Sequence, residues 1–285
     1  MFKHYLITRF NLKNPDWRIT KNKEQLLSDE WMSHRLELFE NYCLPSVIAQ
    51  VNKNFKWLIF FDHSTDDKFK VLIDKILSKY DFISHFYIDG MPKFSASIVD
   101  YISKDASGAQ YIISSRLDND DCIHKNFIDE IQSKFDKQDF MAIDVVKGYS
   151  LQISPEFMLG KKEHVFNPFL SLIEKKENFQ TIWKTDHNLW KKEDRIIKVK
   201  DKRLWLSIIH NKNKVNEFDG YGNVAWEELA KDFVVSDKIY QKVKKDIVHY
   251  DSWKYLSYKN KLYVRYVMFS KNFKKSIGLY KLKGK

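Results

Sequence analysis

Short apolar runs alternate with longer segments of helical apolar spacing through the first half of this chain. The apolar runs have the length and the β-branched and aromatic content of buried strands, and they are residues 4–10, 56–62, 82–88 and 109–118. The segments that repeat apolar residues with the period of a helix are 33–51, 66–80, 94–106 and 125–135. Strands and helices in this alternation predict an α/β fold, with a mostly parallel sheet flanked by helices.

The second half is less regular. Residues 140–146 and 203–211 are predicted strands, and "PFLSLIEKK" at 168–176 is a predicted helix. A polar and aromatic loop is expected from Tyr149 to Phe169.

Composition supports a folded protein of the cell interior. The chain has 285 residues, of which 44% are hydrophobic and 15% aromatic, so it can bury a large core. No segment approaches the roughly 18 unbroken apolar residues of a membrane-spanning helix, and "MFKHYLITRF" has the pattern of a strand rather than of a signal peptide. We therefore expect a cytoplasmic protein in which Cys43 and Cys122 are reduced thiols.

The basic excess is confined to the C-terminus. Residues 242–285 contain 13 Lys and Arg against Asp246 and Asp251, and the rest of the chain is balanced. In this stretch lysines are interleaved with Tyr, Phe, Trp and Leu, a pattern that suits an amphipathic helix on an anionic membrane surface. The alternative is a solvated helix pair that packs its rings on the body. Nucleic acid is not an expected partner, because no nucleic-acid-binding motif accompanies the charge.

Polar side chains gather at the ends of the predicted strands. Thr8 and Arg9 end the first strand, Asp62 ends the second, and Arg116 leads the fourth into "LDNDD". Ligands of an open α/β sheet bind outside the carboxyl ends of its strands, so these side chains are expected along one rim.

Three acids, Asp118, Asp120 and Asp121, occupy four successive positions of that rim. In an extended chain, residues two apart point the same way, so Asp118 and Asp120 would present both carboxylates to one site. Such a pair suits a hard cation, Mg²⁺ or Mn²⁺, with open positions for phosphate oxygens. The alternative is that Asp120 or Asp121 caps the following helix, although one acid would meet that need.

Several segments of the sequence resemble those of a known enzyme family. "SRLDNDD" after three strand–helix units resembles the DxD motif of GT-A glycosyltransferases, and a closer resemblance is to the bacterial putative rhamnosyltransferases. The matching segments span roughly the first 220 residues: "HYLITRFNL", "RLELFENYCLPSVIAQVNKNFKWLIFFD", "SRLDNDDCIHKNFI", "NPFLSLIE", "DHNLW" and "WLSIIHNKNKVN". The resemblance implies a GT-A-like fold and transfer of a sugar, rhamnose by the family name, from a nucleotide diphosphate.

Departure of a nucleotide diphosphate leaves negative charge on phosphate, which a bridging cation stabilises. Asp120 is the first expected metal ligand, and Asp118 would contact the ribose or a metal-bound water. Arg9 and Arg116 are candidates for the diphosphate or the base, since a guanidinium matches phosphate oxygens in bidentate fashion; the alternative is a surface ion pair. The fold implies that Asp62 faces the base or ribose, with a helix cap in "HSTDD" as the alternative. We also expect Thr8 to contact the nucleotide-sugar donor.

His210 follows the apolar run "LWLSII" and is the candidate third ligand of the metal or a phosphate ligand, as the resemblance implies; a histidine bonded in a turn would look the same.

An inverting transfer needs a base near the acceptor hydroxyl, and Asp186 in "KTDHNLW" is the candidate. Glu227 and Glu228 are its rivals, although they have the spacing of a polar helix face.

The acceptor is expected on the loop after Tyr149. The candidate acceptor contacts are Gln152, Asn167 and His187, and Trp183, Trp190 and Trp226 could offer flat rings to a sugar, although such rings are more often core.

The predicted organisation is a GT-A-like domain over 1–240 and a basic aromatic extension over 241–285. Residues 1–125 would form its nucleotide-binding half and 126–240 its acceptor half. The expected function is metal-dependent transfer of a sugar to a glycan or lipid-linked acceptor in surface polysaccharide synthesis, with the tail against the inner membrane face as one option. The competing class is a nucleotide-sugar-binding protein without turnover. Nucleotidyl transfer is less favoured, because "TRFNLKNP" lacks the glycine-rich loop typical of those enzymes.

Overall fold

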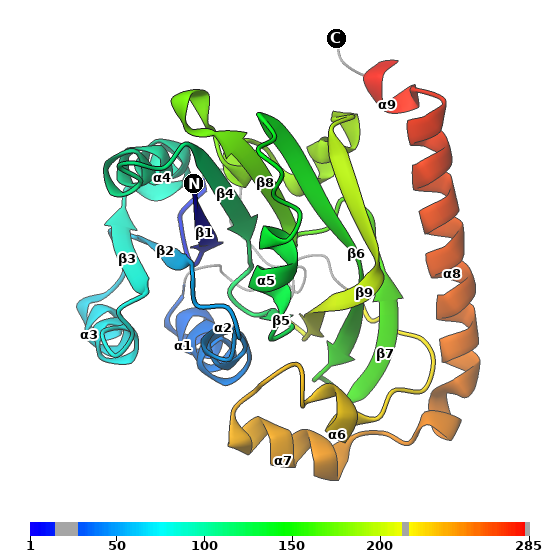
Figure 1. Ribbon diagram of the computed structural model, residues 1–285. Coiled ribbons are helices and arrows are strands. Elements are labelled where there is room, and N and C mark those ends of the chain that lie inside the picture. Colours follow the sequence, from blue (N-terminus) through cyan, green and yellow to red (C-terminus); the bar gives the residue numbers. More distant parts are fainter. Residues whose placement is uncertain (15–27, 213–216, 283–285) are drawn as a thin grey trace.

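The computed structural model describes residues 1–14, 28–212 and 217–282. In these residues one sheet runs through the molecule with the strand order β3-β2-β1-β4-β8-β6-β9-β5, and β7 pairs with β6 (Figure 1). The α/β class predicted from the sequence is confirmed, with a parallel arrangement in the first half and a mixed arrangement in the second.

The first half contains four parallel strands: β1 (Phe2–Arg9), β2 (Lys56–Asp62), β3 (Ile83–Ile88) and β4 (Tyr111–Arg116). Helix α3 (Asp67–Leu77) connects β2 to β3, and α4 (Gly90–Asp105) connects β3 to β4. The chain passes from β1 to β2 and β3 on one side of β1 and then crosses to β4 on its other side, so the strand order reverses at β1. The crevice outside the carboxyl ends of β1 and β4 is the place where such sheets bind ligands.

The connection from β1 to β2 is helical. It consists of α1 (Asp29–Leu38), a π-helical turn (Phe39–Cys43) and α2 (Leu44–Ile48), where the sequence predicts one helix over 33–51. The backbone nitrogen of Pro45 has no hydrogen to donate, so regular α-helical bonding is interrupted at this turn. The Ser28 side chain caps α1 by accepting a hydrogen bond from the amide of Trp31 at 3.2 Å.

The second half of the sheet is mixed. Its strands are β5 (Cys122–Ile123), β6 (Phe140–Gln152), β7 (Met158–Glu163), β8 (Leu170–Lys175) and β9 (Ile196–Ile209), with the short helix α5 (Phe127–Gln132) after β5. The predicted helix at 168–176 is wrong: β8 lies antiparallel between β4 and β6. A short apolar run that is buried on both faces has no period that separates strand from helix. The loop expected from Tyr149 to Phe169 contains β7, paired with β6 as a hairpin.

Both faces of the sheet are buried. Along β1, Leu6 packs in one apolar cluster, whereas Tyr5 and Ile7 pack in the cluster on the opposite face. The alternation follows from the two-residue period of a strand. The two cysteines, Cys43 and Cys122, are buried free thiols, as expected.

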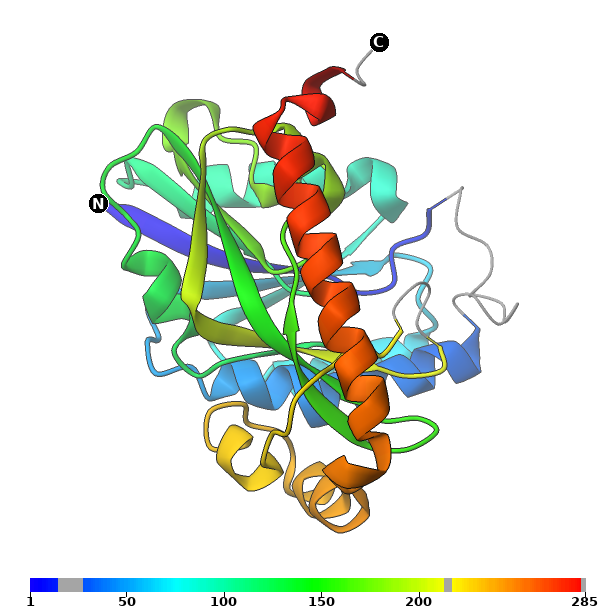
Figure 2. The same ribbon diagram turned by 90° about the vertical axis from the view of Figure 1, so that its right-hand side faces the viewer.

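The chain ends in helices α6 (Trp226–Leu229), α7 (Asp237–Asp246), α8 (Tyr250–Ser276) and α9 (Leu279–Leu282). Figure 2 shows α8 as a long rod that runs along the outside of β6, β7 and β9, so the predicted helical C-terminal extension is confirmed. None of the helices in the described residues has both the length and the apolar character needed to cross a membrane.

Candidate active site

A small cavity lies at the carboxyl ends of β1 and β2. It has a volume of about 170 Å³, and Asn11, Met32, Asp62, Thr65 and Phe69 are among the residues that line it. The Asp62 carboxylate accepts hydrogen bonds from the amide of Lys13 at 2.9 Å and from the amide and hydroxyl of Ser64 at 3.0 and 2.6 Å. Asp62 therefore shapes the cavity wall by holding the segments that follow β1 and β2. The cap of α3 is Asp66, not Asp62.

Thr8 does not reach this rim. Its side chain is fully buried, and its hydroxyl accepts a hydrogen bond from the indole nitrogen of Trp57 at 2.9 Å. Residue 8 faces the core because side chains of a strand alternate between the two faces. The assignment of Thr8 as a donor-binding residue is wrong for this reason.

Arg9 and Arg116 come together on one indole ring. The guanidinium carbon of Arg116 lies 4.0 Å from the centre of the Trp183 ring, and that of Arg9 lies 5.4 Å from it. Arg116 is buried at the end of β4, and its Nε atom has no hydrogen-bond partner. Burial and, to a smaller extent, the Arg116 charge lower the pKa of Arg9 to about 10. Two cations are thus held together at the crevice, with a buried donor unused, and we call Arg9, Arg116 and Trp183 the arginine pocket.

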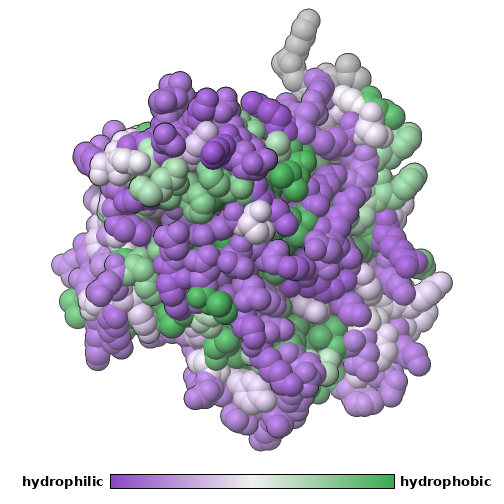
Figure 3. Space-filling view, in the orientation of Figure 1, coloured by the Kyte–Doolittle hydropathy of each residue, from purple (hydrophilic) through white to green (hydrophobic). Residues whose placement is uncertain are grey.

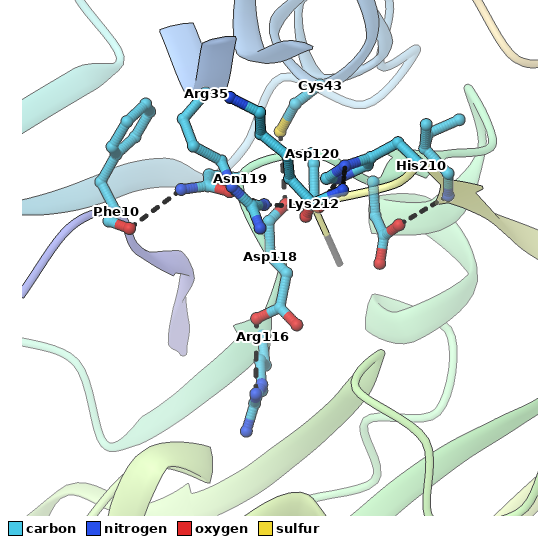
Figure 4. A network of polar contacts seen from close by, with 11 residues as sticks. Phe10, Arg35, Cys43, Arg116, Asp118, Asn119, Asp120, His210 and Lys212 are labelled. Atoms are coloured by element: carbon cyan, nitrogen blue, oxygen red, sulfur yellow. Dashed lines mark hydrogen bonds and ion pairs between the residues drawn. The ribbon is translucent and has the colours of Figure 1, made fainter. Parts of the chain in front are cut away.

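The acids that follow β4 do not share one direction. The strand ends at Arg116, and residues 117–121 form a turn rather than continuing as extended chain. Figure 4 shows Asp118 directed towards Arg116, and Asp120 directed the other way, towards Arg35 and His210. The shortest Arg116–Asp118 contact is 3.4 Å from Nη2 to Oδ1. The expectation that Asp118 and Asp120 point to one side is wrong, because it assumed a strand where the chain turns.

Asp120 is the centre of a buried polar cluster. Its Oδ2 atom lies 2.5 Å from Nη1 of Arg35 and 3.1 Å from Nε2 of His210. Burial acts to raise the pKa of the Asp120 carboxyl, but the Arg35 guanidinium and the His210 hydrogen bond outweigh it, and the pKa lies below its usual value. Asp120 is therefore an ionised carboxylate with a protein cation as its counter-ion.

Asp121 has a different environment. Its Oδ1 atom accepts a hydrogen bond from the backbone amide of Ile208 at 2.8 Å, which fixes the turn to β9. Burial, together with the charges of Asp120 and Asp118, raises the pKa of this carboxyl well above its usual value. Asp121 thus holds the turn in place and caps no helix.

The predicted metal ligands come together only in part. Asp120 and His210 are in hydrogen-bond contact, whereas Asp118 faces Arg116. Within residues 1–14, 28–212 and 217–282, no three His, Cys, Asp or Glu side chains form a group that could hold a metal ion. The donor set that does converge is one carboxylate and one imidazole, and a cation could use it only if Arg35 left the Asp120 oxygen atom that it now contacts.

Asp186 lies near the arginine pocket. It precedes the short 3₁₀ helix His187–Lys192, its side chain is exposed, and it is close enough to Arg9 for its charge to act on that guanidinium. Burial and the Arg116 charge lower the pKa of the neighbouring His187 to about 4, so its imidazole is neutral at pH 7. Asp186 and His187 thus stand beside the same cations as Asp118, and their roles as base and acceptor contact stay predictions.

The family model described as "Putative rhamnosyl transferase" matches residues 3–220 of this sequence. The chain belongs to that family. The description of this family agrees with the expected enzyme class, a glycosyltransferase. Residues 221–285, which include α8, lie outside the match.

Solved structures resemble parts of this rhamnosyl transferase family member. One is S. aureus TarS 1-349, at 11% identity and a TM-score of 0.40, and a second is the same fragment in complex with UDP, at 14% identity and a TM-score of 0.38. The matches cover 72% and 73% of this chain and 60% of each TarS chain, so this chain spans less than two thirds of their length. A 4-diphosphocytidyl-2C-methyl-D-erythritol synthase from Anaerococcus prevotii matches at 13% identity and a TM-score of 0.32, over 80% of this chain and 93% of its own. Likenesses this distant carry no information on substrate. No curated protein matches the sequence.

Two site residues of this family member were not identified from the sequence. Arg35 neutralises Asp120, and the ring of His34 lies 5.1 Å from that of His210, with its Nδ1 atom buried and unpaired. Both are on α1, where a basic residue within a helix has no feature that marks it as a site residue. Only the packing of α1 against the turn after β4 brings Arg35 to Asp120 and His34 to His210. The sequence offers Trp183 as a possible sugar contact. The structure instead places its ring against the guanidinium groups of Arg9 and Arg116.

The buried side chain of Asn167 is not placed to contact a sugar acceptor. It is fully buried, and its amide donates to Asp144 Oδ1, Val145 O and His164 O while accepting from the amide of Phe169. All of its hydrogen-bonding capacity serves the connection between β7 and β8. Gln152, at the end of β6, is half-buried and donates to the carbonyl of Glu156 at 3.2 Å, and its acceptor role stays a prediction.

The rival bases and the remaining tryptophans have structural roles. Glu227 and Glu228 are exposed on α6, where they pair with Lys244 at 3.7 Å and with Lys231 at 2.8 Å, as the polar face of a helix does. Trp190 and Trp226 are core residues. Asp186 is therefore the predicted base that stands beside the arginine pocket.

Proposed function

We propose that this protein transfers a sugar, rhamnose by the family name, from a nucleotide diphosphate to a saccharide or lipid-linked acceptor in surface polysaccharide synthesis. One observation carries the donor class: the guanidinium groups of Arg9 and Arg116 converge on Trp183 at the carboxyl ends of adjacent strands. Two like charges in a partly buried site repel each other, and an anion of high charge density relieves that repulsion.

A diphosphate meets this requirement. Guanidinium groups bind phosphate oxygens through parallel hydrogen bonds, and the unpaired Nε atom of Arg116 offers one such donor. The same groups would stabilise the negative charge that grows on the diphosphate as the bond to the sugar breaks. Arg116 and Arg9 thus bind the donor and stabilise the leaving group.

The nucleoside end of the donor is assigned to the cavity of about 170 Å³ beside Asp62. This cavity and the arginine pocket both lie at the carboxyl ends of the parallel strands. The apolar side chains of Met32 and Phe69 suit a base, and Asn11 and Thr65 offer polar groups to it or to the ribose.

Asp120 and His210 are the residues that would hold a divalent cation, Mn²⁺ or Mg²⁺, with Asp118 directed to the ribose or to a metal-bound water. Such a cation would add Lewis-acid stabilisation to the leaving diphosphate. For Asp120 to take that role, its pairing with Arg35 must loosen, because Arg35 now shares the same oxygen atom.

Asp186 is assigned as the base that removes the proton from the acceptor hydroxyl in an inverting transfer. Its exposed carboxylate lies near Arg9, and His187 and Gln152 are the assigned acceptor contacts. A carboxylate in reach of the hydroxyl is sufficient for this proton transfer.

The donor site is tested by calorimetry and thermal shift with UDP, GDP, dTDP and the matching sugar nucleotides, each with and without Mn²⁺. We compare Arg116→Lys, which keeps the charge and loses the planar fork, with Arg195→Lys. Arg195 is a matched control because its guanidinium also stacks on a ring, Phe140 at 4.0 Å, but pairs with Glu193 away from the crevice. We expect one diphosphate to stabilise the wild type and the control, and Arg116→Lys to weaken its binding by about tenfold or more.

The proposal fails if no diphosphate or sugar nucleotide stabilises the wild type, or if both lysine variants bind equally well. Binding that persists without release of sugar to any offered acceptor, including a panel of glycans, would instead favour a nucleotide-sugar-binding protein.

A further inference from the structure

A row of aromatic side chains covers the outer face of α8. Successive members are three or four residues apart, so they lie on one side of the helix. Their exposed fractions run from 48% to 78% along the series Tyr255, Tyr258, Leu262, Tyr266, Phe269 and Phe273, which we call the aromatic stripe. Figure 3 shows green and pale side chains among purple ones along the edge that α8 occupies. Rings this exposed in one row are unusual for a helix that packs only on its own domain.

Contacts on the opposite face fix the orientation of α8. The Ser257 hydroxyl accepts a hydrogen bond from the amide of Gly222 at 2.8 Å, and Asn260 donates to the carbonyl of Gly220 at 3.0 Å. Farther along, Lys271 bonds to His164 at 2.5 Å, and Lys275 donates to the carbonyl of Lys191 at 3.0 Å. Since these contacts point inward, the aromatic stripe points away from the body along about 27 Å of the helix.

Cations flank the aromatic stripe on both sides. By the helical period, exposed Lys254, Lys261 and Arg265 lie on one side of it, and exposed Lys259 and Lys274 lie on the other. No Asp or Glu occurs between Ser252 and the last residue of the sequence. The outer face of α8 is therefore apolar along its centre and positive along its margins.

We propose that this face of α8 rests on an anionic lipid surface. Exposed rings flanked by lysines suit the boundary between headgroups and acyl chains, where rings enter the interface and ammonium groups lie at the level of the lipid phosphates. The inference is independent of the donor site, because α8 lies outside the part of the chain that matches the family.

Charge argues against a second copy of this chain as the occupant. Two helices paired through their aromatic stripes would bring two sets of cations together with no carboxylate on the facing margins. Helix pairs that associate through an apolar seam normally carry opposite charges beside it. An anionic lipid surface supplies the missing negative charge.

The test is co-sedimentation of the full chain with vesicles of phosphatidylcholine alone and of phosphatidylcholine with about one third phosphatidylglycerol. One variant combines Tyr266→Ser, Phe269→Ser and Phe273→Ser, and a second combines Lys254→Gln, Lys261→Gln and Arg265→Gln. The matched control replaces three exposed lysines on α3 and α4 by glutamine: Lys75, Lys93 and Lys104. Circular dichroism and thermal unfolding verify that each variant is folded.

We expect the wild type and the control to bind the anionic vesicles at low salt, with weak binding to neutral ones and release at high salt. Both α8 variants should lose about tenfold or more of this affinity. The proposal is overturned if the folded wild type does not bind anionic vesicles, or if either α8 variant binds as the wild type does. A lipid-free dimer that the serine variant converts to a monomer would also overturn it, by assigning the face to a second copy. Nucleotide binding is unaffected in each case, so this result is distinct from failure of the donor site.

Discussion

Arg35 Nη1 lies 2.5 Å from Asp120 Oδ2, and the side chains are only 13% and 9% exposed. The ion pair joins helix α1 to the turn after β4, two segments that are 85 residues apart in sequence. The acid at the centre of the candidate site thus has a cation of the protein as its partner, and that pairing affects both stability and ligand binding.

Arg35→Met should lower the free energy of unfolding by about 3 kcal/mol, because it leaves the Asp120 carboxylate buried without its counter-charge. Urea unfolding at neutral pH measures the change. The double variant with Asp120→Asn should recover part of the loss, since the buried charge is then removed as well. A loss below about 0.5 kcal/mol would show that the pair does not stabilise the fold.

Asp120→Asn should remove any dependence of diphosphate binding on Mn²⁺ and should reduce transfer by about 100-fold or more. The amide keeps the size of the side chain but lacks the charge that a divalent cation requires. Calorimetry with and without Mn²⁺ measures this, and Asp121→Asn is the comparison, because that acid accepts a backbone hydrogen bond from Ile208. Equal Mn²⁺ dependence in Asp120→Asn and the wild type would exclude Asp120 as a ligand.

Asp186→Asn should reduce kcat by about 100-fold, while the affinity for the diphosphate stays within about twofold of wild type. The asparagine cannot take the acceptor proton, and the arginine pocket is unchanged. Glu227→Gln is the control, because Glu227 is exposed and lies 3.7 Å from Lys244 on α6. Activity of Asp186→Asn within about threefold of wild type would remove Asp186 as the base.

Asn167→Ala should lower the free energy of unfolding by about 1–3 kcal/mol, because the Phe169 amide and the carbonyls of Val145 and His164 lose their partner. In the variant that stays folded, KM for the acceptor should not change. Gln152→Ala is the matched amide control and should cost less than about 0.5 kcal/mol. The reverse pattern, an altered KM with unchanged stability, would restore Asn167 as an acceptor contact.

Asp144 should make stability depend on pH. Burial raises its pKa to about 7, against the opposing effects of the Phe166 amide and nearby lysines. The folded state therefore favours the protonated carboxyl, and its stabilisation is complete below about pH 4 and is lost as pH rises through about 7.

Between pH 5 and pH 8, the wild type should lose about 2.6 kcal/mol of unfolding free energy relative to Asp144→Asn, which has no proton to lose. Unfolding curves for both proteins across that interval measure the difference. Asp201→Asn, at an exposed carboxylate, should show no such divergence. Parallel pH profiles for Asp144→Asn and the wild type would contradict the prediction.

The regular half of the fold could be predicted from the sequence. The apolar runs that become β1 to β4 alternate with segments of helical period, and connection rules for such units leave little choice but a parallel sheet. The rim position of Asp62, Arg9 and Arg116 followed from their places at strand ends. The prediction failed at 168–176, where β8 is buried on both faces and its apolar run contains no period to separate strand from helix.

Local sequence pattern was thus enough to predict the α/β class, the strand ends that form the crevice, the family and the cationic aromatic character of the C-terminus. The pairing of side chains in the site depended on tertiary packing. That packing turned Asp118 and Asp120 in opposite directions, brought Arg35 to Asp120 and Trp183 beneath two arginines, and buried Thr8 and Asn167. These pairings depend on how segments distant in the chain pack together, and a local pattern of residues contains no record of that packing.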